Sequence, residues 1–280
     1  MEENVIVLPG TKWQIPLVQK LKRRGYRVVV LDCYEDQPAY QYADEHRIVD
    51  ILDKERVYDI AKEYSAAAVL SDECDIATPT IAWVSEKLGK PSIGMEMADL
   101  YTNKYSMREF ARKHGFATPV FYKCFLKEEA VAAYEQYGKK MIMKPLDGNS
   151  SRGVFSICSV QDIKEHFDES MKYAKKEKCV LVEEYIDGEE FSVDGIKTED
   201  GYYTLAIAHK KHYETNENLD QELIFKYSDS VYDYDLLRQT NQNYVEATGL
   251  KFGLTHAEYK IQNGNFYLIE SGARGGGNLL

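Results

Sequence analysis

Short apolar runs alternate with helical patterns along the first hundred residues, and this alternation constrains the fold more than any other feature. The runs predict strands at residues 5–8, 27–31 and 67–70, and the helical patterns predict helices at residues 12–24, 54–64 and 76–87. Such alternation is typical of a parallel sheet whose strands are joined by crossover helices. We therefore predict an α/β domain with a parallel sheet over residues 1–100.

From about residue 100 the pattern changes, because expected strands follow one another through short turns. Strands are expected at residues 120–125, 141–144, 154–158, 180–185, 190–197, 202–212, 254–262 and 266–271, and helices at 104–114, 128–136, 160–174 and 233–248. Strands connected in this way favour antiparallel sheets. We predict an α+β domain over residues 101–280, made of a subdomain at about 116–185 and a remainder at 186–280.

The composition argues against several classes of function. The chain has 280 residues and a net charge of −11, whereas nucleic acids and anionic membranes require a cationic surface. No run is long enough to span a bilayer, and the first residues lack the features of a signal peptide. The five cysteines have no metal-ligand spacing, which favours free thiols in a reducing compartment. We expect a cytoplasmic protein without nucleic-acid or membrane partners.

The first strand-to-helix turn, Leu8-Pro9-Gly10-Thr11-Lys12, is not a G-x-G-x-x-G sequence. The usual dinucleotide fingerprint is therefore missing. The turn still directs backbone N–H groups toward the carboxyl edge of the sheet, where an anion can bind. A substrate carboxylate or phosphate at this turn and a plain tight turn remain equally good interpretations.

The segment KPLDGNSSRGV, residues 144–154, links two expected strands through a loop without apolar anchors. It offers backbone N–H groups, two hydroxyls, and the cations of Lys144 and Arg152, all of which suit phosphate. A P-loop is excluded, because there the Lys follows the loop and a helix comes next. A flap that closes over a nucleotide fits better, with an ordinary hairpin loop as the alternative.

The segment VEEYIDGEEF, residues 182–191, places five carboxylates and a glycine where one expected strand ends and the next begins. A functional interpretation needs acceptors for an adenine amino group and for ribose hydroxyls, which Glu183 and Glu190, seven positions apart, could supply. A solvated acidic turn is the alternative.

Two further carboxylates, Glu258 and Glu270, flank the Asn263-Gly264 turn. Paired carboxylates near phosphates are what Mg²⁺ requires. A two-residue turn places Glu258 opposite Ile269 and directs the two carboxylates to opposite faces. A three-residue loop or an equivalent bulge places Glu258 opposite Glu270. The metal interpretation therefore requires the loop or the bulge.

These three segments, in this order, resemble the ATP-grasp superfamily over essentially the whole chain. The resemblance implies a preceding parallel-sheet domain like that of carboxylate–amine ligases. It also implies that Lys104 and Lys144 contact the phosphates of ATP, and that residues 148–153 form the flap, with Gly148, Ser150, Ser151 and Gly153 at the nucleotide.

The resemblance further assigns the remaining site residues. Glu183 would accept from the adenine amino group, and the backbone of Glu184 and Ile186 would hold the ring edge. Glu190 would bind the ribose. The cofactor would be ATP with one or two Mg²⁺ ions, or Mn²⁺ in their place, held by the carboxylates at 258 and 270. Arg274 would act with Lys144 in catalysis by steadying the transferred phosphate.

The chain departs from the family pattern in two ways. The pattern after the second metal carboxylate is usually E-x-N, but here it is Glu270-Ser271-Gly272. Water or Ser271 would then have to replace the third metal ligand. The chain also stops at GGGNLL, where relatives continue, and we expect a truncated form with an incomplete second half.

The resemblance implies a ligase that phosphorylates a carboxylate and joins the acyl phosphate to an amine, with small-molecule substrates and with a homodimer as one option. Two alternatives are a biotin-carboxylase-like or purine-pathway enzyme and a non-catalytic nucleotide-binding module. The stretch His209-Lys210-Lys211-His212 either lines the substrate pocket or forms a solvated basic edge. Because strand side chains alternate, at most two of these four residues can face the site.

Overall fold

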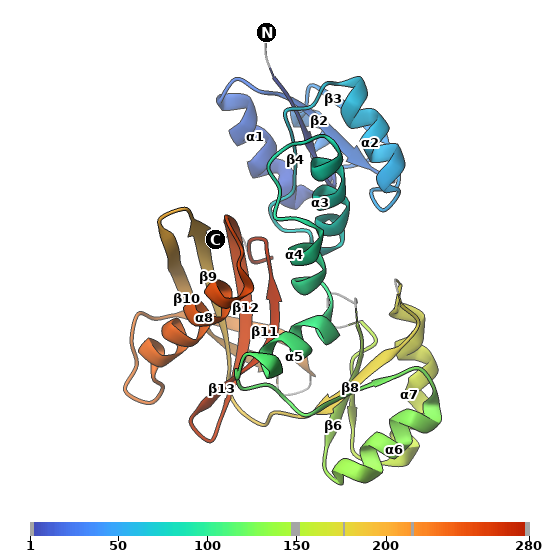
Figure 1. Cartoon of the computed structure of the whole chain (residues 1–280), viewed down its shortest axis with the longest axis vertical. Coiled ribbons are helices and arrows are strands. Elements are labelled where there is room, and N and C mark those ends of the chain that lie inside the picture. The colour runs from blue at the N-terminus through green and yellow to red at the C-terminus, as the bar shows by residue number, and fades with distance from the viewer. Residues whose placement is uncertain (1–2, 147–151, 176, 214–215, 278–280) are drawn as a thin grey trace.

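The computed structural model describes residues 3–146, 152–175, 177–213 and 216–277, and its first part is a parallel sheet (Figure 1). The sheet order is β3-β2-β1-β4. Its strands are β1 (Asn4–Val7), β2 (Arg27–Asp32), β3 (Glu45–Ile48) and β4 (Ala68–Leu70), and the helices are α1 (Ile15–Arg23), α2 (Lys54–Glu63) and α3 (Thr78–Lys87), with short 3₁₀ turns at Lys12–Gln14, Tyr40–Tyr42 and Asp75–Ala77. Apolar clusters lie on both faces of this sheet, as expected for parallel strands covered by helices.

A four-stranded antiparallel sheet comes next along the chain, in the order β5-β8-β6-β7. It comprises β5 (Phe121–Cys124), β6 (Met141–Pro145), β7 (Phe155–Ile157) and β8 (Val180–Glu184), with helices α6 (Lys127–Tyr137) and α7 (Val160–Tyr173). Met143 and Val182 pack in the core that includes residues of these helices. Alternation along the strands then directs Lys144 and Glu183 to the other face.

A five-stranded antiparallel sheet follows, in the order β11-β10-β9-β12-β13. Its strands are β9 (Glu190–Thr198), β10 (Gly201–Tyr213), β11 (Asn216–Phe225), β12 (Gly253–Gln262) and β13 (Asn265–Gly272), and α8 (Tyr234–Thr248) covers it. Phe191, Val193, Ala257 and Tyr259 belong to the core shared with α8. The opposite face of the same strands is therefore polar, with ionisable side chains at alternate positions.

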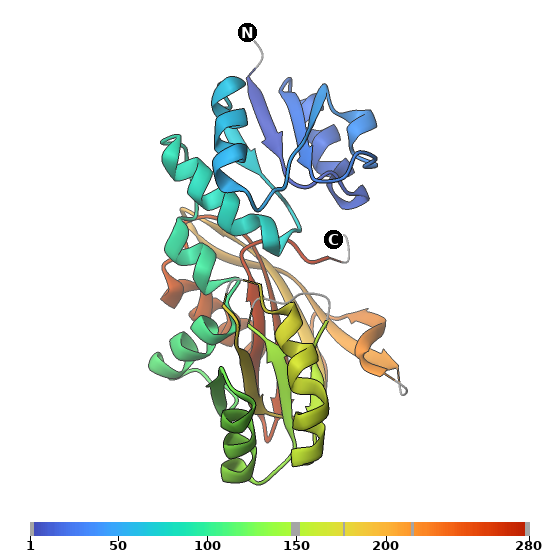
Figure 2. The same ribbon diagram turned by 90° about the vertical axis from the view of Figure 1, so that its right-hand side faces the viewer.

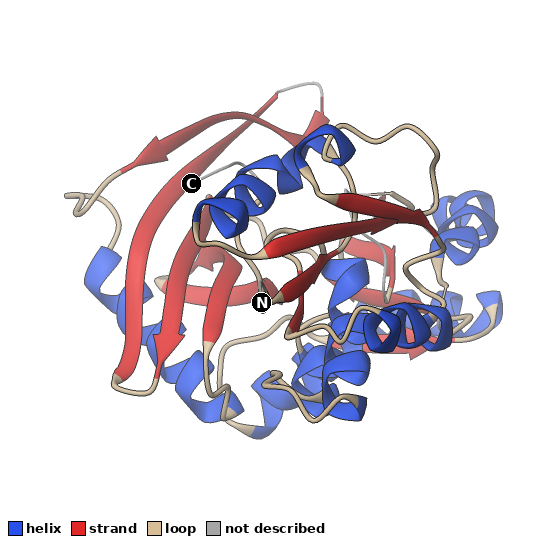
Figure 3. Cartoon of the chain, turned by 90° about the horizontal axis from the view of Figure 1, so that it is seen from above, coloured by secondary structure: helices blue, strands red, loops and turns tan. Residues whose placement is uncertain are grey.

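Two helices connect the parallel sheet to the antiparallel sheets, α4 (Met95–Leu100) and α5 (Lys104–Lys113). Figure 1 shows α5 between the two antiparallel sheets, Figure 2 shows the same ribbon from the side, and Figure 3 shows helices flanking the strands. No helix in the described part of the chain is long and apolar enough to cross a membrane.

The predicted fold class is confirmed: a parallel α/β sheet precedes antiparallel sheets. The predicted domain boundaries stay a prediction. Three elements were not predicted, β3, α4 and β11. Strand β3 has the sequence Glu-His-Arg-Ile and lies at the edge of its sheet, so it lacks the apolar run that marks a strand buried on both faces.

Candidate functional site

Helix α5 brings two cations to the space between the antiparallel sheets. Asn103 caps the helix by accepting from the backbone N–H groups of Tyr105 and Ser106, which fixes Lys104 in the first turn. Arg108 lies one turn later on the same face. Both side chains are buried, and the Nζ of Lys104 donates to Oε1 of Glu270 on β13 at 2.9 Å.

Arg108 holds Glu183 in a bidentate ion pair that is fully buried. Its Nε lies 2.9 Å from Oε2 of Glu183 and its Nη2 lies 3.2 Å from Oε1. Lys144 pairs with the same carboxylate. Burial alone would raise the pKa of Glu183, but Arg108 and Lys144 outweigh it and lower that pKa to about 2. Burial lowers the pKa of Lys144, against the attraction of Glu183.

A second ionic group lies on the polar face of the five-stranded sheet, around the ammonium of Lys210. Its Nζ is 2.6 Å from Oε1 of Glu190, 2.8 Å from Oε1 of Glu258 and 3.3 Å from Oδ2 of Asp220. Burial opposes charge on Lys210, Glu190 and Glu258, but the attraction between the ammonium and the two carboxylates is stronger. The pKa of Lys210 is therefore raised, and the pKa values of Glu190 and Glu258 are lowered. Lys210, Glu190 and Glu258 are therefore charged at neutral pH.

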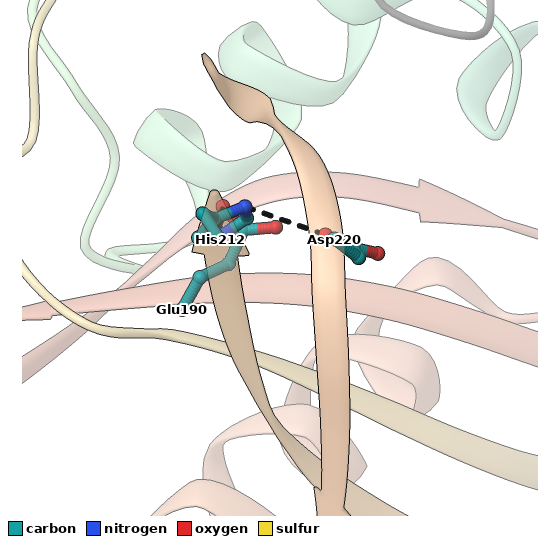
Figure 4. A group of neighbouring side chains, drawn as sticks. All are labelled: Glu190, His212 and Asp220. Atoms are coloured by element: carbon teal, nitrogen blue, oxygen red, sulfur yellow. Dashed lines mark ion pairs between the residues drawn. The ribbon is translucent and has the colours of Figure 1, made fainter. Parts of the chain in front are cut away.

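The side chains of Glu190, His212 and Asp220 converge on the same face of the sheet (Figure 4). Each offers one atom, and the three atoms lie within 4.8 Å of one another, a spacing that can hold a metal ion. Lys210 already pairs with both carboxylates of this group. The cluster is therefore an ion-pair network in this structure.

The basic stretch at residues 209–212 alternates as expected. Lys210 and His212 face Glu190, whereas His209 and Lys211 lie 2.6 and 3.0 Å from Glu189. Two of the four side chains therefore face the site.

The register of β12 and β13 contains the bulge that the metal interpretation requires. The turn has two residues, with Gln262 paired to Asn265, and Tyr259 pairs with Leu268. The register then shifts by one residue, so that Glu258 lies opposite Glu270 and Ile269 is the extra residue. The two carboxylates thus share one face, although their role as metal ligands stays a prediction.

The glycine at position 272, where the family pattern E-x-N has Asn, has a steric explanation. Arg274 forms a bidentate pair with Asp75 of the first domain, at 2.8 and 2.6 Å. A Cβ at Gly272 would lie 3.0 Å from Oδ1 of Asp75 and 3.2 Å from Nε of Arg274. A larger side chain at position 272 would therefore crowd this ion pair.

Ser271 does not replace the missing ligand, which corrects one expectation. It is fully buried and pairs with Ala257, whereas the neighbouring pair is Glu258 with Glu270. Because successive side chains on a strand point to opposite faces, Ser271 lies on the core face, away from both carboxylates.

The expected adenine contacts stay predictions. Both oxygens of Glu183 are already engaged by cations, so an adenine amino group would have to share one of them. The N–H of Glu184 donates to the carbonyl of Val120 at 2.7 Å, and Ile186 is buried. In the expected flap, Gly153 has a φ of 73°, whereas Gly148, Ser150 and Ser151 lie outside the described residues.

The first strand-to-helix turn does not leave all of its N–H groups free for an anion. The N–H of Gly10 donates to the buried carboxylate of Asp32 at 2.8 Å. Two more acids, Asp72 and Glu73, follow β4. The N–H of Gly275, in the segment after β13, donates to the carbonyl of Asp72 at 2.7 Å.

Two residues that organise the site, Arg108 and Asp75, were not predicted from the sequence. Arg108 has a signal that could have identified it: it lies four residues after Lys104, between the buried positions Met107 and Ala111, where an exposed arginine is not expected. Asp75 has no comparable signal, because its partner is 199 residues away in sequence.

Comparison with known proteins agrees with this arrangement. A family model described as an ATP-grasp domain matches residues 137–280, and one described as a PylC-like N-terminal domain matches residues 6–80. The formate-dependent phosphoribosylglycinamide formyltransferase of Prochlorococcus marinus strain MIT 9301 is 23% identical over 213 residues, which cover 74% of this chain and 54% of that protein. The chain thus spans about half the length of the curated relatives it matches.

Two solved structures show the same fold. The L-amino acid ligase from Bacillus licheniformis superimposes with a TM-score of 0.79 at 20% identity, covering 98% of this chain and 67% of that one. The biotin carboxylase domain of Hydrogenobacter thermophilus 2-oxoglutarate carboxylase, a dimer in complex with MgADP, ADP and bicarbonate, gives a TM-score of 0.78 at 18% identity, covering 98% and 64%. Because the ATP-grasp model covers more than half of the chain, this protein belongs to the ATP-grasp family and carries a PylC-like N-terminal domain.

Proposed function

We propose that the chain is an ATP- and Mg²⁺-dependent ligase that phosphorylates a carboxylate and joins the resulting acyl phosphate to an amine. The observation that carries this proposal is that Glu258 and Glu270 lie opposite each other on paired strands. Lys210 donates to the first carboxylate and Lys104 to the second. Family membership supplies the reaction class, and the geometry of these charges supports it.

The donor set suits Mg²⁺, which takes one or two carboxylates and leaves its other positions to phosphate and water. In the proposed nucleotide complex, Lys104 would pair with a phosphate instead of Glu270, and the carboxylates of Glu258 and Glu270 would hold the metal. Lys144 and Arg274 would be the catalytic cations, and Glu190 would bind the ribose. Bound Mg²⁺ would neutralise charge on the phosphates.

The proposed reaction has two steps, and the protein contributes positioning and electrostatics to each. First, a substrate carboxylate oxygen forms a bond to the γ-phosphorus while the bond from that phosphorus to the β-phosphate oxygen breaks, which releases ADP. Second, a neutral amine nitrogen attacks the acyl carbon, and phosphate leaves as the amine loses a proton to water. Lys144 and Arg274 would stabilise the phosphoryl charge in both steps.

A phosphate-release screen with ATP and Mg²⁺ tests the proposal. Carboxylates, including formate and amino acids, are combined with a panel of amines, and each is also tested alone. Release that needs both substrates, with a mass-detected amide product, supports the ligase. We expect Glu270→Gln to lower this release roughly 100-fold or more, since it removes a transition-state contact. Glu135→Gln, an exposed change on α6, is the matched control and should leave it unchanged.

Other outcomes identify the alternatives. Release stimulated by bicarbonate would favour a carboxylase, a candidate raised by the similarity to the biotin carboxylase domain. Nucleotide binding without any substrate-stimulated release would favour a non-catalytic module. Glu270→Gln that turns over as fast as the parent would remove the proposed metal site.

A further inference from the structure

The bulge in β13 determines which side chain faces Glu258. If the two-residue turn were followed by a regular ladder, Glu258 would lie opposite Ile269, and Glu270 would point to the core face. The shift between Glu258 and Tyr259 prevents this. A bulge leaves one residue unpaired and disrupts the ladder locally, so something outside the two strands has to favour it.

Arg108 contacts this bulge directly. Its Nη2 donates to the carbonyl oxygen of Ile269, the extra residue, at 2.7 Å. The guanidinium is fully buried and also donates two hydrogen bonds to Glu183, one from Nε and one from the same Nη2. Because a guanidinium is planar and its donors have fixed directions, it joins helix α5, strand β8 and the bulge in one geometry.

We propose that Arg108 is a positioning residue that holds the bulge at Ile269 and so keeps Glu270 opposite Glu258. It acts through the backbone of β13 and through Glu183, and it has no role in contacting substrate. This inference rests on the proposed function, in which those two carboxylates bind the metal.

The same guanidinium connects the two halves of the site. Glu183 pairs with Lys144 as well as with Arg108. One buried group therefore orients the carboxylate beside a proposed phosphate lysine and also sets the register of the proposed metal ligands. Loss of the Arg108 guanidinium should weaken the binding of a divalent cation more than the binding of nucleotide, since Lys104 and Lys144 remain in place.

The test uses Arg108→Lys, with ADP and Mn²⁺ as probes. Lysine keeps a positive charge beside Glu183 but cannot span both Glu183 and the Ile269 carbonyl. We expect ADP affinity without divalent cation to stay within about threefold of the parent, and Mn²⁺ affinity of the ADP complex to fall about tenfold or more, as for other residues that orient metal ligands. Arg112→Lys, an exposed change one turn along α5, is the control and should alter neither.

A second variant separates positioning from general stability. Deletion of Ile269 makes Leu268 and Glu270 neighbours, and a regular ladder then pairs Glu258 with Glu270 without a bulge. In the Arg108→Lys background, this deletion should restore at least part of the Mn²⁺ affinity. Unchanged Mn²⁺ affinity in folded Arg108→Lys, or a loss that the deletion does not relieve, would overturn the inference.

Failure of the proposed function looks different from failure of this inference. A parent protein that binds ADP but no Mn²⁺ would contradict the metal site itself. The register is then measured without nucleotide or metal, by oxidising a Glu258→Cys/Glu270→Cys double variant, since a disulfide needs closely opposed Cβ atoms. The inference requires slower cross-linking when Arg108→Lys is added, and an unchanged rate would refute it.

Discussion

Glu73, at the carboxyl end of the parallel sheet, should make the protein less stable as the pH rises. Its Oε2 is buried without a hydrogen-bond partner among the described residues. Burial and the neighbouring Asp72 raise the pKa of Glu73 from 4.5 to about 7, although Arg274 acts in the opposite direction. A carboxyl whose pKa is raised by folding favours the folded state only while it is protonated.

The sign and size of the effect follow from these two pKa values. The stabilising contribution is complete below the unfolded value of 4.5 and is lost as the pH rises through about 7. The difference of about 2.5 pH units corresponds to an upper limit of about 3.4 kcal/mol. The side chain keeps partial contact with water, so we expect about 1–2 kcal/mol.

Glu73→Gln replaces the carboxyl by a neutral group of the same shape. The free energy of unfolding, measured in urea, should match that of the parent at about pH 4 and exceed it by about 1–2 kcal/mol at about pH 8. Glu35→Gln, an exposed change in the same domain, should show no such difference. A Glu73→Gln variant whose advantage is the same at both pH values, or is absent at about pH 8, would refute the raised pKa of Glu73.

Three further substitutions test the ionic contacts. Glu183→Gln leaves two buried cations without their counter-charge and should lower the free energy of unfolding in urea by about 3–5 kcal/mol; a cost below about 1 kcal/mol would mean that the pairs are not as buried as described. Asp75→Asn breaks the bidentate contact to Arg274 and should cost about 1–3 kcal/mol in the same assay, with no loss expected from the exposed change Asp235→Asn. Lys210→Met should raise the pKa of Glu258, detectable by NMR titration of a ¹³C-labelled carboxylate, and an unchanged titration would contradict the pairing.

The sequence predicts the fold class because parallel and antiparallel strands differ in their pattern of apolar and polar residues. Buried parallel strands such as β1 and β2 are continuous apolar runs, whereas β9 and β12 alternate. Strands β3 and β11 were not predicted, because edge strands bury less and carry more polar residues. Their positions follow from pairing with a neighbour, which is a tertiary property.

Candidate site residues could be identified where they lie close together in the sequence, but contacts between distant segments could not. The carboxylates of Glu258 and Glu270 stand out in the sequence, and parity shows that they can meet only through a longer loop or a bulge. The sequence does not say which of these occurs, because the bulge at Ile269 is held from helix α5 by a residue 161 positions away. The ion pair of Arg274 with Asp75 likewise joins residues far apart in sequence, 199 positions from each other, so the sequence does not predict it.

The ion pairs between the two antiparallel sheets are better explained by ligand binding than by stability. Replacing buried ion pairs by apolar groups is often neutral or stabilising, so stability alone gives little reason for Lys104, Lys210, Glu258 and Glu270 to be there. Each lysine neutralises one of two facing carboxylates. If a phosphate chain with its cation enters, the lysines can turn to phosphate while the carboxylates turn to metal, and no charge is left unpaired. If the proposed function is right, nucleotide and metal should therefore bind with positive coupling. Nucleotide alone would draw the lysines away and leave the carboxylates unpaired, and metal alone would leave the lysines unpaired.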